Sequence, residues 1–270
     1  MTLEKATTWN KRIAAQIGAG LGFALSSLFF FATGQWRYLI LAPVGALVGL
    51  AVGALLHHYP GLRENAAHAL DAVRSTGATI LAFFAHERLL VRFARLFLVG
   101  VILFLATWSI AYGFLPERLL ARGDSVRMMG NDEVATTLWA EWRFMIVRNL
   151  PWVPGIALIS LLLGYAYALP VPLLWIVLYA LILGTNSFSI PLPALMPPSL
   201  AVLERAGPYE MLAYLFAAAA SYSLAKISLP WRKVDEASRV HGWNVALALL
   251  ASAAVIMLAA WREAAMLLSS

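Results

Sequence analysis

Few side chains in this chain could do chemistry, and the ionisable ones lie at the edges of apolar stretches. Glu210 and Lys226 are the charged groups within one such stretch. Charged groups at membrane depth are costly and often functional, so Glu210 is a candidate for an ion or proton site. Alternatively, Glu210 interacts with the dipole of a helix that begins after Pro208, and Lys226 extends to the headgroups. This scarcity argues against a proton relay within the bilayer.

A hydrolytic or metal site would require clustered histidines, carboxylates or nucleophiles. None of the histidines lies inside a firmly predicted span, and His57 and His58 would point about 100° apart on a helix. The chain has no cysteine, which excludes disulfides and thiolate chemistry. It also lacks the His-Glu-x-x-His, phosphate-loop and dinucleotide motifs. We therefore expect a non-enzymatic protein with no catalytic residues, no metal and no cofactor. The histidines are His57, His58, His68, His86 and His241.

The composition indicates a membrane protein. Of 270 residues, 61% are apolar and 13% are charged, whereas soluble domains carry about 25% charged residues. The mean hydropathy is +0.76. The net charge of +6 is interpreted as loop Lys and Arg that set topology and contact anionic headgroups. The lipid bilayer is thus an expected partner, and nucleic acid is not.

Seven stretches are apolar enough to be candidate spans, each of which needs about 20 residues. The predicted fold is all-α, a polytopic transmembrane bundle of five to seven spans with interfacial amphipathic helices. The first stretch exceeds a signal-peptide core of about 7–15 residues and is read as a retained span. The stretches are Ile13–Thr33, Tyr38–Leu56, Leu96–Leu115, Leu150–Leu169, Val171–Met196, Tyr209–Leu229 and Trp243–Trp261.

Two polar connections have helical patterns. In His57–Arg95, the arginines Arg88, Arg92 and Arg95 share one helix face. They indicate either an interfacial helix that binds anionic lipid or an extension of the third span whose arginines reach the headgroups.

In the second connection, Pro116–Arg148, Asp132 is a plausible N-cap. Trp139 and Trp142 then lie on one side of the helix. Because tryptophan prefers the headgroup level, a helix lying on the membrane is expected.

Glycines spaced four residues apart predict close helix packing. Gly45, Gly49 and Gly53 form one ladder, and Gly18 and Gly22 form a shorter one. These ladders pack either against each other within the first hairpin or against a partner.

The fifth stretch contains the polar run Gly184 to Ser189 before several prolines. It is either a broken helix lining a cavity or a span that ends near Gly184.

The basic residues favour a cytoplasmic N-terminus. With seven spans and the N-terminus inside, inside segments hold 12 of the 20 Lys and Arg residues and outside segments hold 8. We divide the chain into an N-terminal hairpin (1–56), a polar connection (57–95) and a membrane domain (96–270).

Within the membrane domain, residues 144–232 resemble the stage II sporulation protein M family of polytopic membrane proteins. The resemblance rests on an aromatic lead-in to Asn149, an apolar span with Gly184 and Asn186, and a Gly-x-x-Glu element at Gly207 and Glu210. Ala206 stands where that family typically has a histidine.

The resemblance implies a scaffold or subunit of a membrane complex, multi-pass in the bacterial plasma membrane, with other protein subunits or copies of itself as partners. The alternative is a permease subunit that works with a separate ATPase, motivated by the polar run with Asn186 and Ser187.

Overall fold

The fold is taken from a computed structural model. It describes residues 75–120, 137–188, 196–227 and 242–269, together with Val44, Leu47 and Leu229. The first two predicted spans and the glycine ladder positions Gly18, Gly22, Gly45, Gly49 and Gly53 lie outside the described residues, as does the N-cap candidate Asp132. The chain divides into two compact units, Met1–Ile80 with Leu120–Gly130 and Leu81–Leu119 with Asn131–Ser270. The second unit is a helical bundle and holds the features below.

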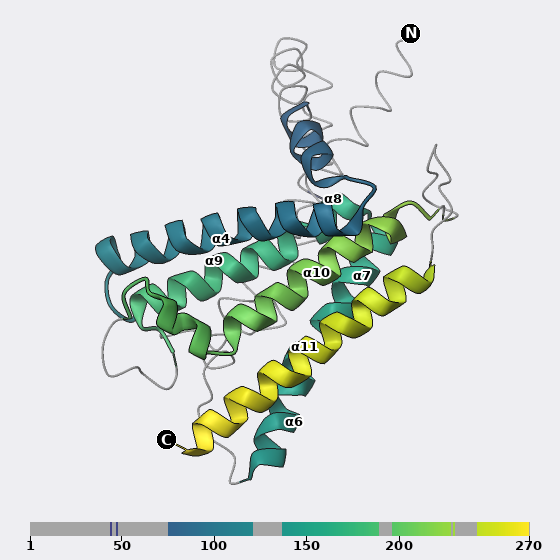
Figure 1. Cartoon of the computed structure of the whole chain (residues 1–270). Coiled ribbons are helices and arrows are strands. Elements are labelled where there is room, and N and C mark those ends of the chain that lie inside the picture. Colours follow the sequence, from purple (N-terminus) through teal and green to yellow (C-terminus); the bar gives the residue numbers. More distant parts are fainter. Residues whose placement is uncertain are drawn as a thin grey trace, which may run out of the picture. The chain divides into compact units, whose positions relative to one another are not determined.

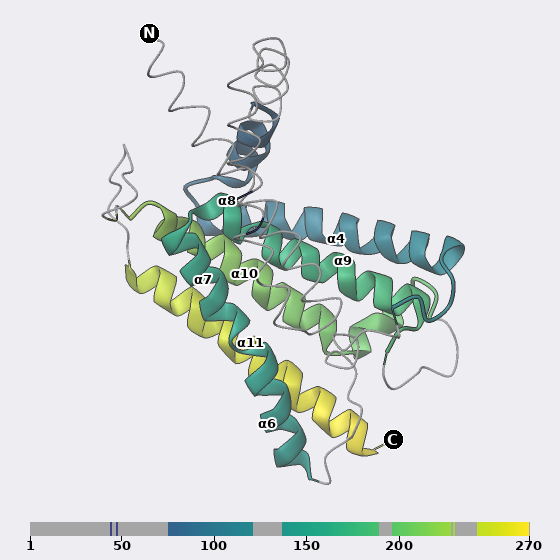
Figure 2. The same ribbon diagram turned by 180° about the vertical axis from the view of Figure 1, so that it is seen from behind.

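The bundle is all-helical over its described residues (Figures 1 and 2). Four of its helical segments are long and apolar enough to cross a membrane. This confirms the coarse prediction of a helical protein with apolar spans. The elements are α4 (Leu89–Phe114), α6 (Leu138–Asn149), α7 (Trp152–Leu162), α8 (Tyr165–Ala168), α9 (Pro170–Thr185), the 3-10 helix η2 (Leu200–Glu204), α10 (Gly207–Ala225) and α11 (Gly242–Ser269).

Helix α4 begins earlier than the predicted third span. Arg88 has an extended backbone and precedes the first helical residue, Leu89. The helix then runs unbroken to Phe114, just before Pro116. The arginine-bearing segment is therefore the first part of the spanning helix, and the predicted boundary at residue 95 falls inside α4.

The turn between the next two spans lies at Gly164, whereas the predicted spans Leu150–Leu169 and Val171–Met196 leave Pro170 between them. Gly164 has a φ of 112°, a conformation that glycine adopts without steric cost. Pro170 instead occupies the first turn of α9. A proline there costs no hydrogen bond, because N–H groups of the first turn have no partner within the helix. As a result, apolar span-length segments cover Leu138–Leu162 and Tyr165–Thr185.

Helix α10 is the central helix of the bundle. It packs against α4, α7, α9 and α11, and Figures 1 and 2 show it between these neighbours. Its run Ala217–Ala220 is buried, and such small side chains let surrounding helices approach closely. A buried hydroxyl links α7 to α10, since Ser160 Oγ donates to the Ser221 carbonyl oxygen at 2.8 Å.

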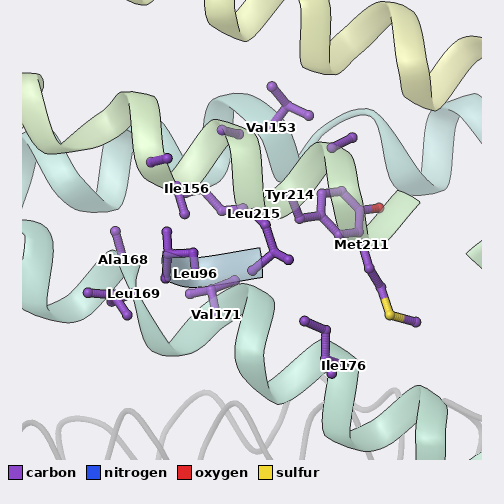
Figure 3. Packing of buried hydrophobic residues seen from close by; sticks show 14 of the residues in the cluster. Leu96, Val153, Ile156, Ala168, Leu169, Val171, Ile176, Met211, Tyr214 and Leu215 are labelled. Atoms are coloured by element: carbon purple, nitrogen blue, oxygen red, sulfur yellow. The ribbon is translucent and has the colours of Figure 1, made fainter. Parts of the chain in front are cut away.

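The main core fills the space around α10. Leu96, Ile156 and Leu215 are almost completely buried there, and Figure 3 shows their side chains converging with that of Ile176. Gly100 lets α4 lie close to this core, because an added Cβ would sit 2.9 Å from Ile176 Cδ1.

Candidate functional site

Two residues of the family-like motif meet directly at one end of the bundle. Asn149 is the last residue of α6, just before Pro151 ends that helix, and Glu210 lies in the first turn of α10. Asn149 Nδ2 donates to Glu210 Oε1 at 2.5 Å. The Tyr214 hydroxyl, one turn further along α10, donates to the Asn149 carbonyl oxygen at 3.2 Å. This joins the α6–α7 junction to the start of α10.

Further charged side chains interact electrostatically with Glu210. The Arg148 guanidinium interacts electrostatically with Glu210, Glu263 and Glu141. Glu263, on α11, also interacts with Arg205, and Glu141 is only 1% exposed. Glu141, Arg148, Glu210, Glu263 and Arg205, which we call the charge network, thus connect α6, α10, α11 and the segment before α10.

The charge network is mixed in sign, with three carboxylates and two guanidinium groups. Opposite charges that lie together in a poorly hydrated place hold helices in register and can receive a polar or charged group from a partner. Among the described residues, no cluster of histidines and carboxylates could hold a metal ion. The charged and amide side chains of this site offer electrostatic and hydrogen-bonding interactions.

Next to the charge network lies an outward-facing group, Leu200, Leu203, Tyr209 and Arg262, which we call the Tyr209–Arg262 patch. Arg262 lies 5.4 Å from the centre of the Tyr209 ring and donates to the Leu203 carbonyl oxygen at 3.3 Å. The Tyr209 hydroxyl donates to the same oxygen at 2.9 Å. Leu200, on η2, is 82% exposed. The patch is thus held in place while presenting an apolar side chain.

The remaining family-like residues have packing roles. Gly207 lies against the Tyr179 ring of α9, where an added Cβ would sit 2.3 Å from Tyr179 Cζ. Gly184 lies against the backbone of α4. Gly207 lies three residues before Glu210 in the sequence. Gly184 instead allows the close contact between α4 and α9.

Asn186 ends α9. It has a φ of 52° and its N–H bonds back to the carbonyls of Ile182 and Leu183. Asparagine tolerates this left-handed conformation, which commonly terminates helices. The span thus ends at Thr185, as in the second of the two interpretations left open by the sequence, and the predicted extension to Met196 is not helical at the described residues.

At the opposite end, Arg92 departs from the predicted lipid-facing set. Arg88 is exposed and Arg95 is partly exposed, but Arg92 is 3% exposed. Its Nε donates to the Ala219 carbonyl oxygen of α10 at 2.8 Å, and its Nη1 donates to the carbonyls of His86 and Glu87. These backbone acceptors satisfy the guanidinium, so Arg92 faces inward and fixes the segment before α4 to α10.

An exposed ion pair adds to this attachment. Lys226 Nζ lies 3.0 Å from Glu87 Oε1. The hydrogen bond and charge of Lys226 lower the pKa of Glu87 below its ordinary value of 4.5, and the hydrogen bond to Glu87 raises the pKa of Lys226 above 10.5. The depressed Glu87 pKa means that its stabilisation is present above about pH 4.5 and is lost as pH falls through the folded-state pKa. The raised Lys226 pKa means that its stabilisation is present below about pH 10.5 and is lost as pH rises further.

We expect Glu87→Gln to lower the thermal unfolding midpoint slightly and equally between about pH 5 and pH 9, because exposed pairs contribute little. The difference should vanish near pH 3. Thermal unfolding of the detergent-solubilised chain measures it, with Glu117→Gln at another exposed carboxylate as the control. A difference that persists at pH 3 would show that the glutamine acts through something other than the ion pair.

Sequence reasoning missed Arg148, Glu263, Glu141 and Arg205 as site residues. Arg148 and Arg205 fall in predicted connections between spans, and Glu263 lies past the predicted end of the last span. One local signal was present: Glu141 and Arg148 are seven residues apart, which places them on one face of a helix.

The fold and the charge network define a helical protein with spans of membrane length and a group of charged side chains at one bundle end. Comparison of the chain with protein-family models, curated proteins and solved structures finds no match.

Proposed function

We propose that this chain is a non-enzymatic integral membrane protein of the bacterial plasma membrane that acts as a scaffold or subunit of a membrane complex. This is the role that the resemblance to stage II sporulation protein M implies. The observation that supports it best is the Tyr209–Arg262 patch beside the charge network. Tyrosine and arginine are enriched among the residues that contribute most to binding energy at protein interfaces, and Leu200, on the short helix η2, is 82% exposed.

The arrangement of the patch suits docking. Its aromatic and guanidinium groups are pre-positioned by hydrogen bonds to the Leu203 carbonyl, so little side-chain entropy remains to be lost on binding. The adjoining carboxylates and arginines offer charge recognition that would fix the orientation of a partner.

Site-specific photocrosslinking in the native host tests this proposal. A benzophenone amino acid replaces Leu200 in one variant and Leu250 in another; Leu250 is 63% exposed on α11 and outside the patch. We expect one discrete protein adduct from Leu200, identified by mass spectrometry, and none of that mass from Leu250. Adding Tyr209→Ala and Arg262→Ala should reduce the Leu200 adduct at least about tenfold, as expected for loss of interface anchors.

A second copy of the chain in the adduct would make the complex a homo-oligomer. Lipid adducts alone at Leu200, or the same protein adducts at both positions, would overturn the proposal. Equal yields of folded protein, judged by gel filtration in detergent, are the control for the double replacement.

A further inference from the structure

The tryptophans of the bundle fall into two groups that differ in position and exposure. Trp152 and Trp175 contact each other at 5.6 Å and pack against the main core. Trp139 and Trp243, in contrast, are 64% and 72% exposed, and Trp261 is 39% exposed. The exposed group lies near the ends of α6 and α11.

At one end, three tryptophans form a compact cluster. The Trp139, Trp142 and Trp261 rings meet edge to face with centroids 5.1, 5.6 and 5.9 Å apart. Trp142 Nε1 donates to the Met257 carbonyl oxygen at 3.0 Å. The cluster packs α6 against α11. Trp139 and Trp261 remain exposed in it.

The separation of two tryptophans along α11 is close to the thickness of the hydrocarbon core of a bilayer. Trp243 and Trp261 are 18 residues apart on one continuous helix, which corresponds to about 27 Å at 1.5 Å per residue. The hydrocarbon core of a typical bilayer is about 30 Å thick. Between the two tryptophans, the exposed positions of α11 include Leu247, Leu250 and Leu258.

We propose that Trp243 at one end, and Trp139 with Trp261 at the other, lie in the two interfacial zones of the bilayer and set the depth of the bundle. The partner of this surface is the headgroup and glycerol region of phospholipids, where the amphipathic indole ring is most stable. The inference concerns depth and holds whether or not the chain docks another protein.

A consequence follows for the charge network. Glu263 is two residues beyond Trp261, and Glu141 is two residues from Trp139. Both carboxylates are therefore at the level of the headgroups, where a charge costs far less than at the bilayer centre. These two carboxylates of the network are then reached from one side of the membrane.

Single-cysteine labelling measures the depth directly, because the chain contains no cysteine. The full chain is reconstituted in vesicles of phosphatidylcholine and phosphatidylglycerol after Leu247→Cys, Leu250→Cys, Ala254→Cys, Leu258→Cys or Ala265→Cys; each of these positions is exposed. A nitroxide label then reports its accessibility to oxygen, which partitions into lipid, relative to a nickel chelate, which stays in water.

We expect the oxygen-to-nickel ratio to be greatest at residues 250 and 254 and to be several-fold lower at residue 265. A flat profile, or a maximum at residue 265, would overturn the proposal. As a second arm, lipids brominated near the headgroup should quench the native tryptophan fluorescence. Quenching should fall after Trp243→Phe with Trp261→Phe but not after Trp152→Phe. An equal loss of quenching in the Trp243→Phe, Trp261→Phe variant and in the Trp152→Phe variant would also overturn the proposal.

Discussion

Replacing Gly184 by alanine is expected to lower the free energy of unfolding of the bundle by about 2–3 kcal/mol. An added Cβ would lie 2.5 Å from Ala111 Cβ, 2.8 Å from the Tyr112 nitrogen and 2.9 Å from the Trp108 oxygen. Two of these atoms belong to the backbone of α4 and cannot rotate away, so the helices must separate. Overpacking of this kind costs about 1–3 kcal/mol, and losing the contacts around buried Trp108 adds to it.

Gly113→Ala is the matched control on α4. An added Cβ there meets nothing within 4 Å, so the substitution should be neutral or stabilise by up to about 1 kcal/mol through helix propensity. Unfolding in mixed micelles with increasing sodium dodecyl sulfate, followed by tryptophan fluorescence, measures both variants. Similar midpoints for the two would show that α4 and α9 are not in close contact at Gly184.

The second large loss of folding stability is expected on replacing Arg148. Arg148→Met removes the cation that interacts electrostatically with Glu210, Glu263 and Glu141 and should lower the free energy of unfolding by about 2–3 kcal/mol. Breaking a fully buried ion pair costs about 3–5 kcal/mol because a charge is left uncompensated. The lower figure applies here because Arg148 is only partly buried.

Removing one carboxylate together with the guanidinium should recover much of the lost stability. Arg148→Met combined with Glu210→Gln leaves fewer uncompensated carboxylates, and replacing both partners is often nearly neutral. Arg143→Met, at an exposed position of the same helix, should change stability by less than about 0.5 kcal/mol. A double variant as unstable as the sum of its parts would contradict the idea that Arg148 acts by compensating these carboxylates.

Part of this site could be predicted from the sequence. Asn149 and Glu210 were both singled out through the family resemblance, and they form a hydrogen bond in the structure. Glu141 and Glu263 could not be found in this way, because they are 69 and 53 residues of chain away from Glu210. Which helix faces another depends on how side-chain shapes interlock, and one sequence does not display that.

The class of protein follows from the composition of the chain. A charged fraction of 13% and long apolar stretches leave apolar helices as the physically stable solution in lipid, since backbone polar groups must be paired within each span. Which polar side chains are buried, and which groups they bond to, depends on how distant helices pack together. Arg92 has the helical spacing of a headgroup-facing arginine, yet it faces inward because the carbonyls of His86, Glu87 and Ala219 lie within its reach. Periodicity is local information, whereas the partners of a charged group come from distant parts of the chain.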